Sequence, residues 1–192
     1  MSEFIHFLDA DGSCNQMCQT SESNWTKALN HAGLIHREAS YLENKKKHID
    51  WWVQKDITSV ERSVDLKGMK RANGRHSNVG KDDWKWMWIE IFGKYQNYQT
   101  KEWKRINGWL LAETVDIIAF ELPKGFLLVE RIDLLKLCRK IVDRTYVDYA
   151  WQAQKKLYTR SVDVITKIHV DDITKSKKIH GMEVRYQLLK KV

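Results

Sequence analysis

The sequence has little of what disulfide-bonded, secreted or membrane-spanning proteins require. Its 192 residues include three cysteines, Cys14, Cys18 and Cys138, and this odd count argues against a disulfide framework. No histidine stands at zinc-binding spacing from them. No apolar run approaches the roughly 18 residues that cross a membrane, and the first residues lack the basic-then-apolar pattern of a secretion signal. We therefore expect a cytoplasmic protein with no membrane partner.

Motifs of several common enzyme classes are also missing. The chain has no glycine-rich phosphate loop and no pattern of a serine triad. It has a single proline, Pro123, and 43% hydrophobic residues, a composition typical of a folded globular protein. The length predicts one domain with a sizeable core. We expect that domain over 21–192, preceded by an irregular N-terminal arm over 1–20.

Positive charge and aromatic side chains are present in excess. The chain carries 33 Lys and Arg against 25 Asp and Glu, which gives a net charge of +8, and it holds nine Trp and seven Tyr. A basic balance favours polyanionic partners such as nucleic acid. Aromatic rings can stack on bases, although core packing is the commoner role of any single ring.

The spacing of apolar residues predicts a strand-rich middle between helices. Helices are expected over 22–31 and 132–142, where apolar residues recur at helical spacing. Strands are expected over 34–40, 48–53, 63–68, 84–93, 115–122, 126–130 and 162–168. A basic, aromatic insertion is expected over 94–107, and a short helix followed by a surface segment from Asp171. The predicted fold class is α/β or α+β, with a mixed central β-sheet flanked by helices.

Two of these strands bring acidic residues together with a lysine. Alternate side chains of a strand share one face, so Asp65 and Lys67 point the same way. If the two strands pair antiparallel, Asp50 can join them. Two carboxylates, with the backbone carbonyl of Leu66, suit Mg²⁺ or Mn²⁺ beside a phosphate. Lys67 would either orient and deprotonate a water or stabilise negative charge on the phosphate. The plainer interpretation is a surface ion pair of little energy.

Basic segments flank the two strands. The run Lys45, Lys46 and Lys47 precedes the first strand, and it is either solvated surface or a phosphate contact. A long polar loop follows the second strand and contains Lys70, Arg71 and Arg75, the best candidates for nucleic-acid contacts.

Asp50 is followed, after fourteen residues, by Asp65-Leu66-Lys67. This spacing resembles the pattern of the PD-(D/E)XK nuclease superfamily, which has the restriction-endonuclease-like fold. The resemblance implies an endonuclease that uses Mg²⁺ or Mn²⁺ to hydrolyse nucleic acid, with DNA favoured over RNA. It implies Asp50, Asp65 and Lys67 as catalytic residues, and a further acid on the preceding helix at Glu22. Many members act in pairs, so a homodimer is implied as well.

Further segments are similar to an uncharacterised phage and bacterial branch of that superfamily, and together they cover roughly 20–173. They include Trp88-Ile89-Glu90, where the branch has Glu-x-Lys and this chain has Glu90-Ile91-Phe92. Glu90 is therefore either a third metal-binding carboxylate or a structural residue. Two alternatives stay open: a nucleic-acid-binding protein that does not cleave, and a phage-type protein that binds a host protein through its tryptophan-rich segments. The same fold can carry any of these functions.

Overall fold

The first of two β-sheets holds the residues of the predicted site. A computed structural model describes residues 13–69, 83–97, 99–142, 154–158 and 161–191. This sheet runs in the order β1-β2-β3-β6-β7-β10, and only the β3–β6 pairing in it is parallel. Its strands are β1 (Ile35–Glu38), β2 (Trp51–Gln54), β3 (Arg62–Lys67), β6 (Ile117–Leu122), β7 (Gly125–Glu130) and β10 (Tyr186–Lys190).

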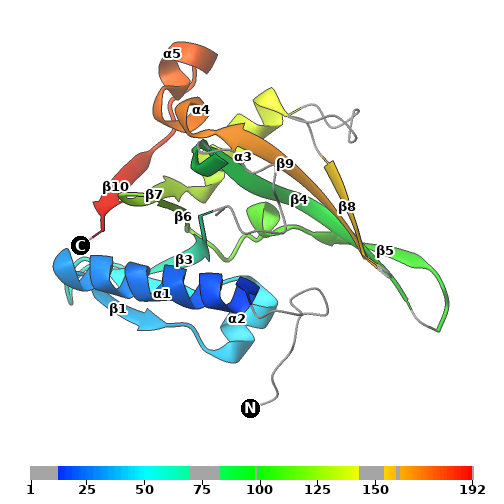
Figure 1. Cartoon of the computed structure of the whole chain (residues 1–192), viewed down its shortest axis with the longest axis horizontal. Coiled ribbons are helices and arrows are strands. Elements are labelled where there is room, and N and C mark those ends of the chain that lie inside the picture. The colour runs from blue at the N-terminus through cyan, green and yellow to red at the C-terminus, as the bar shows by residue number, and fades with distance from the viewer. Residues whose placement is uncertain (1–12, 70–82, 98, 143–153, 159–160, 192) are drawn as a thin grey trace.

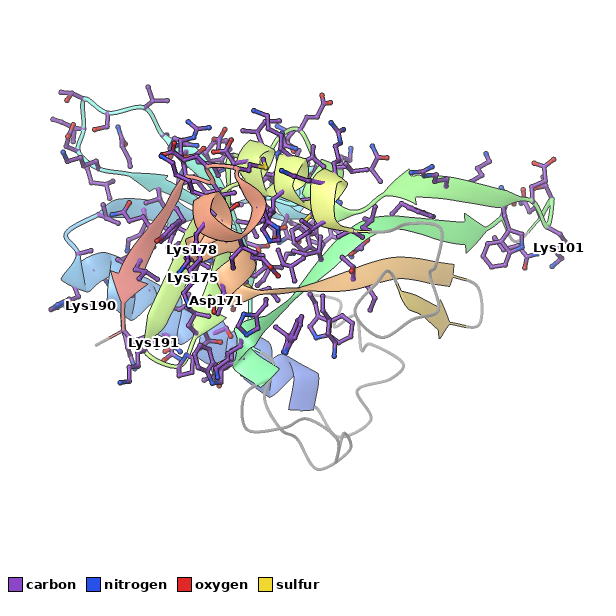
Figure 2. All side chains as sticks on the ribbon, turned by 90° about the horizontal axis from the view of Figure 1, so that it is seen from above. Lys101, Asp171, Lys175, Lys178, Lys190 and Lys191 are labelled. Atoms are coloured by element: carbon purple, nitrogen blue, oxygen red, sulfur yellow. The ribbon has the colours of Figure 1, made fainter. Side chains whose placement is uncertain are left out.

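The second sheet is antiparallel and runs in the order β5-β4-β9-β8. Its strands are β4 (Trp86–Gln96), β5 (Trp103–Asn107), β8 (Gln154–Tyr158) and β9 (Ser161–His169). These strands extend away from the first sheet as a long ribbon (Figure 1). Lys101 lies at the tip of the ribbon, and Lys175, Lys178 and Lys190 lie at the opposite end of the molecule (Figure 2).

Helices pack on both faces of the first sheet, which confirms a mixed α and β fold. They are α1 (Ser13–His31), α2 (Tyr41–Lys47), α3 (Arg131–Ile141), α4 (Val170–Thr174) and α5 (Ser176–His180), with the 3₁₀ turns η1 (Asp83–Lys85) and η2 (Trp109–Leu111). Trp25 of α1 is fully buried and packs edge-to-face on Phe126, at a centroid distance of 5.0 Å. On the opposite face, α3 and the inner face of β4 share a core with Ile118 and Leu127.

The segment before the site forms a helix, α2, where the sequence had predicted only a charged run. Ser40 accepts a hydrogen bond from the Glu43 N–H, and the Glu43 carboxylate accepts one from the Ser40 N–H, which is a capping box. The last turn of α2 carries Lys45, Lys46 and Lys47, where cations complement the helix dipole. All three lysines are exposed.

Three other expectations at the level of elements are wrong in part. Helix α1 already begins at Ser13, so the second part of the expected arm over 1–20 is helical. The insertion over 94–107 is the end of β4 and its hairpin partner β5. The expected surface segment near the C-terminus contains β10, which pairs with β7 in the first sheet. Among the described residues, no helix is both long and apolar enough to cross a membrane.

Candidate active site

The antiparallel pairing of β2 with β3 brings Asp50, which directly precedes β2, close to Asp65 on β3. Trp51 pairs with Val64 and Trp52 with Ser63. The Asp50 N–H donates to the Val64 carbonyl at 2.9 Å, so Asp50 and Trp51 both lie across from Val64, which is the geometry of a β-bulge.

Asp65 is a buried carboxylate held beside an ammonium. It is only 2% exposed, and its Oδ1 lies 2.7 Å from Nζ of Lys67. Burial raises the pKa of Asp65 to about 7, even though Lys67 acts to lower that pKa, and the nearby Asp50 raises it further. The sequence predicted that Asp65 and Lys67 share a face, but not that this face is buried.

Asp50 is held in the plane of the sheet by two neighbours. Its Oδ2 accepts a hydrogen bond from the Leu66 N–H at 2.7 Å, and its Oδ1 accepts one from the Asn44 side chain in α2. The N–H and C=O of one strand residue point toward the same neighbouring strand. The Leu66 carbonyl therefore faces the side on which Asp50 lies.

The oxygen atoms of this site fit a divalent cation. Oδ2 of Asp65 is buried and has no hydrogen-bond partner, which is costly for a carboxylate unless a proton or a cation meets it. With Asp50 and the Leu66 carbonyl it offers the oxygen donors that Mg²⁺ or Mn²⁺ takes, leaving coordination positions for water and phosphate. In the part of the chain that the structure describes, no third Asp, Glu, His or Cys joins them in a metal-binding group.

The charges of this site contribute to the pKa shifts of two further side chains, Glu22 and His48. Desolvation raises the pKa of Glu22 on α1, and the Glu38 and Asp50 carboxylates raise it further. Desolvation lowers the pKa of His48, as does the Lys67 ammonium, while Asp50 acts in the opposite direction. Glu22 is exposed, so it adds negative charge near Asp50 without completing a ligand group among the described side chains.

The 3₁₀ turn η2 places an indole over the lysine. Nζ of Lys67 lies 4.7 Å from the centroid of the Trp109 ring, which is a cation–π contact. Gly108 makes this possible, because a Cβ at that position would lie 2.5 Å from the Glu90 carbonyl oxygen. The Gly108 N–H also donates to the Ile91 carbonyl at 3.2 Å. The backbone of β4 therefore fixes where Trp109 lies.

The other predicted site residues have separate positions. Glu90 lies on β4 in the second sheet, and it belongs to no group of three metal-binding side chains among the described residues. Its role as a third metal ligand stays a prediction, and β4 pairs with β9 and β5 rather than with β3. Lys45, Lys46 and Lys47 lie on the helix that leads to Asp50. The expected nucleic-acid contacts Lys70, Arg71 and Arg75 fall outside the described residues.

Acidic residues of β6 and its N-terminal flank have structural roles. Asp116 accepts hydrogen bonds from both the N–H and the hydroxyl of Ser63, each at 2.9 Å. Glu121 is fully buried at its side chain and accepts hydrogen bonds from Ser21, Asn24, the Met69 N–H and Lys191. These contacts tie α1 and the end of β10 to the strand beside β3.

Sequence reasoning missed Asn44 and Trp109. Asn44 orients Asp50 from α2, and the capping-box residues of that helix, Ser40 and Glu43, were the signal available in the sequence. Trp109 gave no signal of its own, since its contact with Lys67 depends on pairing between distant segments. Searches of known protein families, of curated proteins and of solved structures find no match to this chain.

Proposed function

We propose that this protein is a metal-dependent endonuclease of the PD-(D/E)XK type that hydrolyses phosphodiester bonds in nucleic acid, with DNA favoured. The observation that carries the proposal is the buried Asp65 carboxylate close to Asp50, which has one oxygen on Lys67 and one oxygen without a hydrogen-bond partner. The antiparallel run β1-β2-β3 followed by the parallel neighbour β6 supports a restriction-endonuclease-like arrangement.

Each residue has a distinct part in the proposed reaction. Asp50, Asp65 and the Leu66 carbonyl would hold Mg²⁺ or Mn²⁺, which polarises a phosphate and lowers the pKa of a water. Lys67 presents a positive charge where a phosphate oxygen gains negative charge in the transition state. Water adds to phosphorus, the bond to the leaving oxygen breaks, and one strand is cut. The Trp109 ring covers Lys67 and limits its contact with bulk water.

The test is cleavage of single-stranded, duplex and branched DNA and RNA by the purified protein with Mg²⁺ or Mn²⁺. We expect cleavage with either metal, none with EDTA, and none in Asp65→Asn or Lys67→Met. Lys55→Met is the matched control, because Lys55 is an exposed lysine in the turn of the same hairpin, and we expect it to cleave normally. Intact substrates under every condition would reject the endonuclease.

A second candidate function is nucleic-acid binding without cleavage. It is favoured by the two-carboxylate composition of the site, since the described residues supply no third acidic ligand. In that case Asp65→Asn would leave binding unchanged or strengthen it, because the substitution removes negative charge beside Lys67. Binding that weakens with salt, together with intact substrates in Mg²⁺ and Mn²⁺, would select this candidate.

A further inference from the structure

A cleft lined by tryptophans opens beside the proposed active site, at the ends of the parallel strands β3 and β6. Its volume is about 220 Å³, and Lys67 lines it together with residues of β4 and η2. The aromatic side chains that line it are Trp84, Trp86, Trp88, Trp109 and Phe120. Four of the nine tryptophans in the chain therefore gather at one place next to Lys67.

Strand alternation in β4 explains why Trp86 and Trp88 lie outside the core, whereas Trp109 and Phe120 are 6% and 3% exposed. Met87 and Ile89 point into the core and are 4% and 0% exposed, so the alternate residues Trp86 and Trp88 point to the other face. Trp86 is 37% exposed. Large rings left accessible on a sheet face, instead of buried in a core, are characteristic of a binding surface.

Cations accompany the rings. Nζ of Lys167 lies 4.5 Å from the Trp88 ring centroid, and Nζ of Lys85 lies 5.6 Å from that of Trp84. Lys67 supplies a third ammonium at the wall of the cleft. The one carboxylate that lines the cleft, Glu121, is engaged by Lys191 at 2.8 Å. Aromatic faces beside positive charge suit a planar ring that is joined to a phosphate.

We propose that this cleft binds an unpaired nucleobase of single-stranded nucleic acid and thereby presents the adjoining phosphodiester to Lys67. The inference rests on the proposed function and names its substrate class. A volume of about 220 Å³ lies below the roughly 300–1,000 Å³ of pockets for drug-sized ligands, so it suits a single ring system. Bases within a duplex are stacked on both faces and cannot enter without being flipped out.

The test measures binding of a fluorescently labelled oligothymidylate in EDTA, where no cleavage occurs. Stacking on one ring contributes ~1–3 kcal/mol, so Trp86→Leu should weaken binding roughly 5- to 150-fold. Trp86→Phe should keep most of the affinity, because it keeps an aromatic face. Trp103→Leu is the control, since Trp103 is 49% exposed on β5 of the same sheet but does not line the cleft. Binding to a duplex should be weak in every variant.

The outcomes separate this inference from the proposed endonuclease. Equal affinity of Trp86→Leu and the unsubstituted protein for oligothymidylate overturns the cleft, even if cleavage is observed. Weakened binding in Trp86→Leu supports the cleft, even if no metal gives cleavage. If Trp86→Leu does not fold, quenching of tryptophan fluorescence in the unsubstituted protein decides. Quenching by oligothymidylate and not by a duplex supports the inference, and its absence, or binding to neither, overturns it.

Discussion

Replacing the buried carboxylate at position 65 with an amide should change the pH dependence of stability. Asp65→Asn keeps the shape of the side chain but cannot ionise. The pKa of Asp65 is raised from 3.8 to about 7 in the folded protein. The folded state therefore holds the proton more tightly than the unfolded state does. As pH rises from 4 to 7, the unsubstituted protein must lose stability relative to the Asn variant.

The size of the effect follows from the same shift. Each pH unit between the two pKa values changes the free energy of unfolding by ~1.4 kcal/mol, so the full effect is about 4 kcal/mol. About 2 kcal/mol of it should fall between pH 5 and 7. The difference in stability between Asp65→Asn and the unsubstituted protein should grow across that window and level off above it.

Urea unfolding followed by far-UV circular dichroism, at several pH values and with EDTA present, measures this difference. In a separate series without EDTA, added Mg²⁺ should stabilise the unsubstituted protein, because a cation that binds only the folded state shifts the unfolding equilibrium. The same Mg²⁺ should not stabilise Asp65→Asn. A stability difference that stays flat from pH 5 to 8 would show that Asp65 is not a strained buried acid. That result would contradict the buried Asp65 carboxylate on which the proposed metal site rests.

Two further substitutions test the surroundings of the site. Burial acts to raise the pKa of Glu121, yet its donors lower that pKa to about 2; Glu121→Gln should therefore cost about 3 kcal/mol at pH 7 and little near pH 2, measured by urea unfolding. A cost that does not shrink as pH falls from 5 would contradict this sign. Gly108→Ala should cost on the order of 2 kcal/mol, because its Cβ meets the Glu90 carbonyl. It should also reduce cleavage by displacing Trp109, whereas normal activity would show that the indole has no part in the site.

Much of the first sheet was predictable because its signals are local. The alternation of apolar and polar residues on the two strands gave the hairpin and the shared face of Asp65 and Lys67. Helix α2 was not predicted because it buries no side chain and therefore has no apolar periodicity, although its capping-box residues Ser40 and Glu43 are present in the sequence. Strand β10 was missed because Leu188 is exposed and the pattern lacks clear alternation.

The placement of Glu90 and the depth of Asp65 could not be predicted in the same way. Strand geometry alone puts Glu90 on one face with Trp86 and Trp88, because alternate residues of a strand share a face. Which sheet the strand joins depends on its pairing with β9, and Glu90 pairs with Ile165, far along the chain. The burial of Asp65 likewise depends on packing by segments distant in sequence.

The close approach of Gly108 to the backbone of β4 also affects how the walls of the cleft can move. Trp86 and Trp88, on one wall of the cleft, belong to β4, and Trp109 is held to the backbone of the same strand. These three rings should therefore move together as one wall of the cleft, and Lys67 on β3 lies on the opposite wall. A displacement of the ribbon that carries Lys101 would reach Trp109 through the main chain of β4 and Gly108, and Lys67 through its contact with the Trp109 ring. In the proposed endonuclease, binding of nucleic acid along the ribbon would thereby be coupled to the position of Lys67.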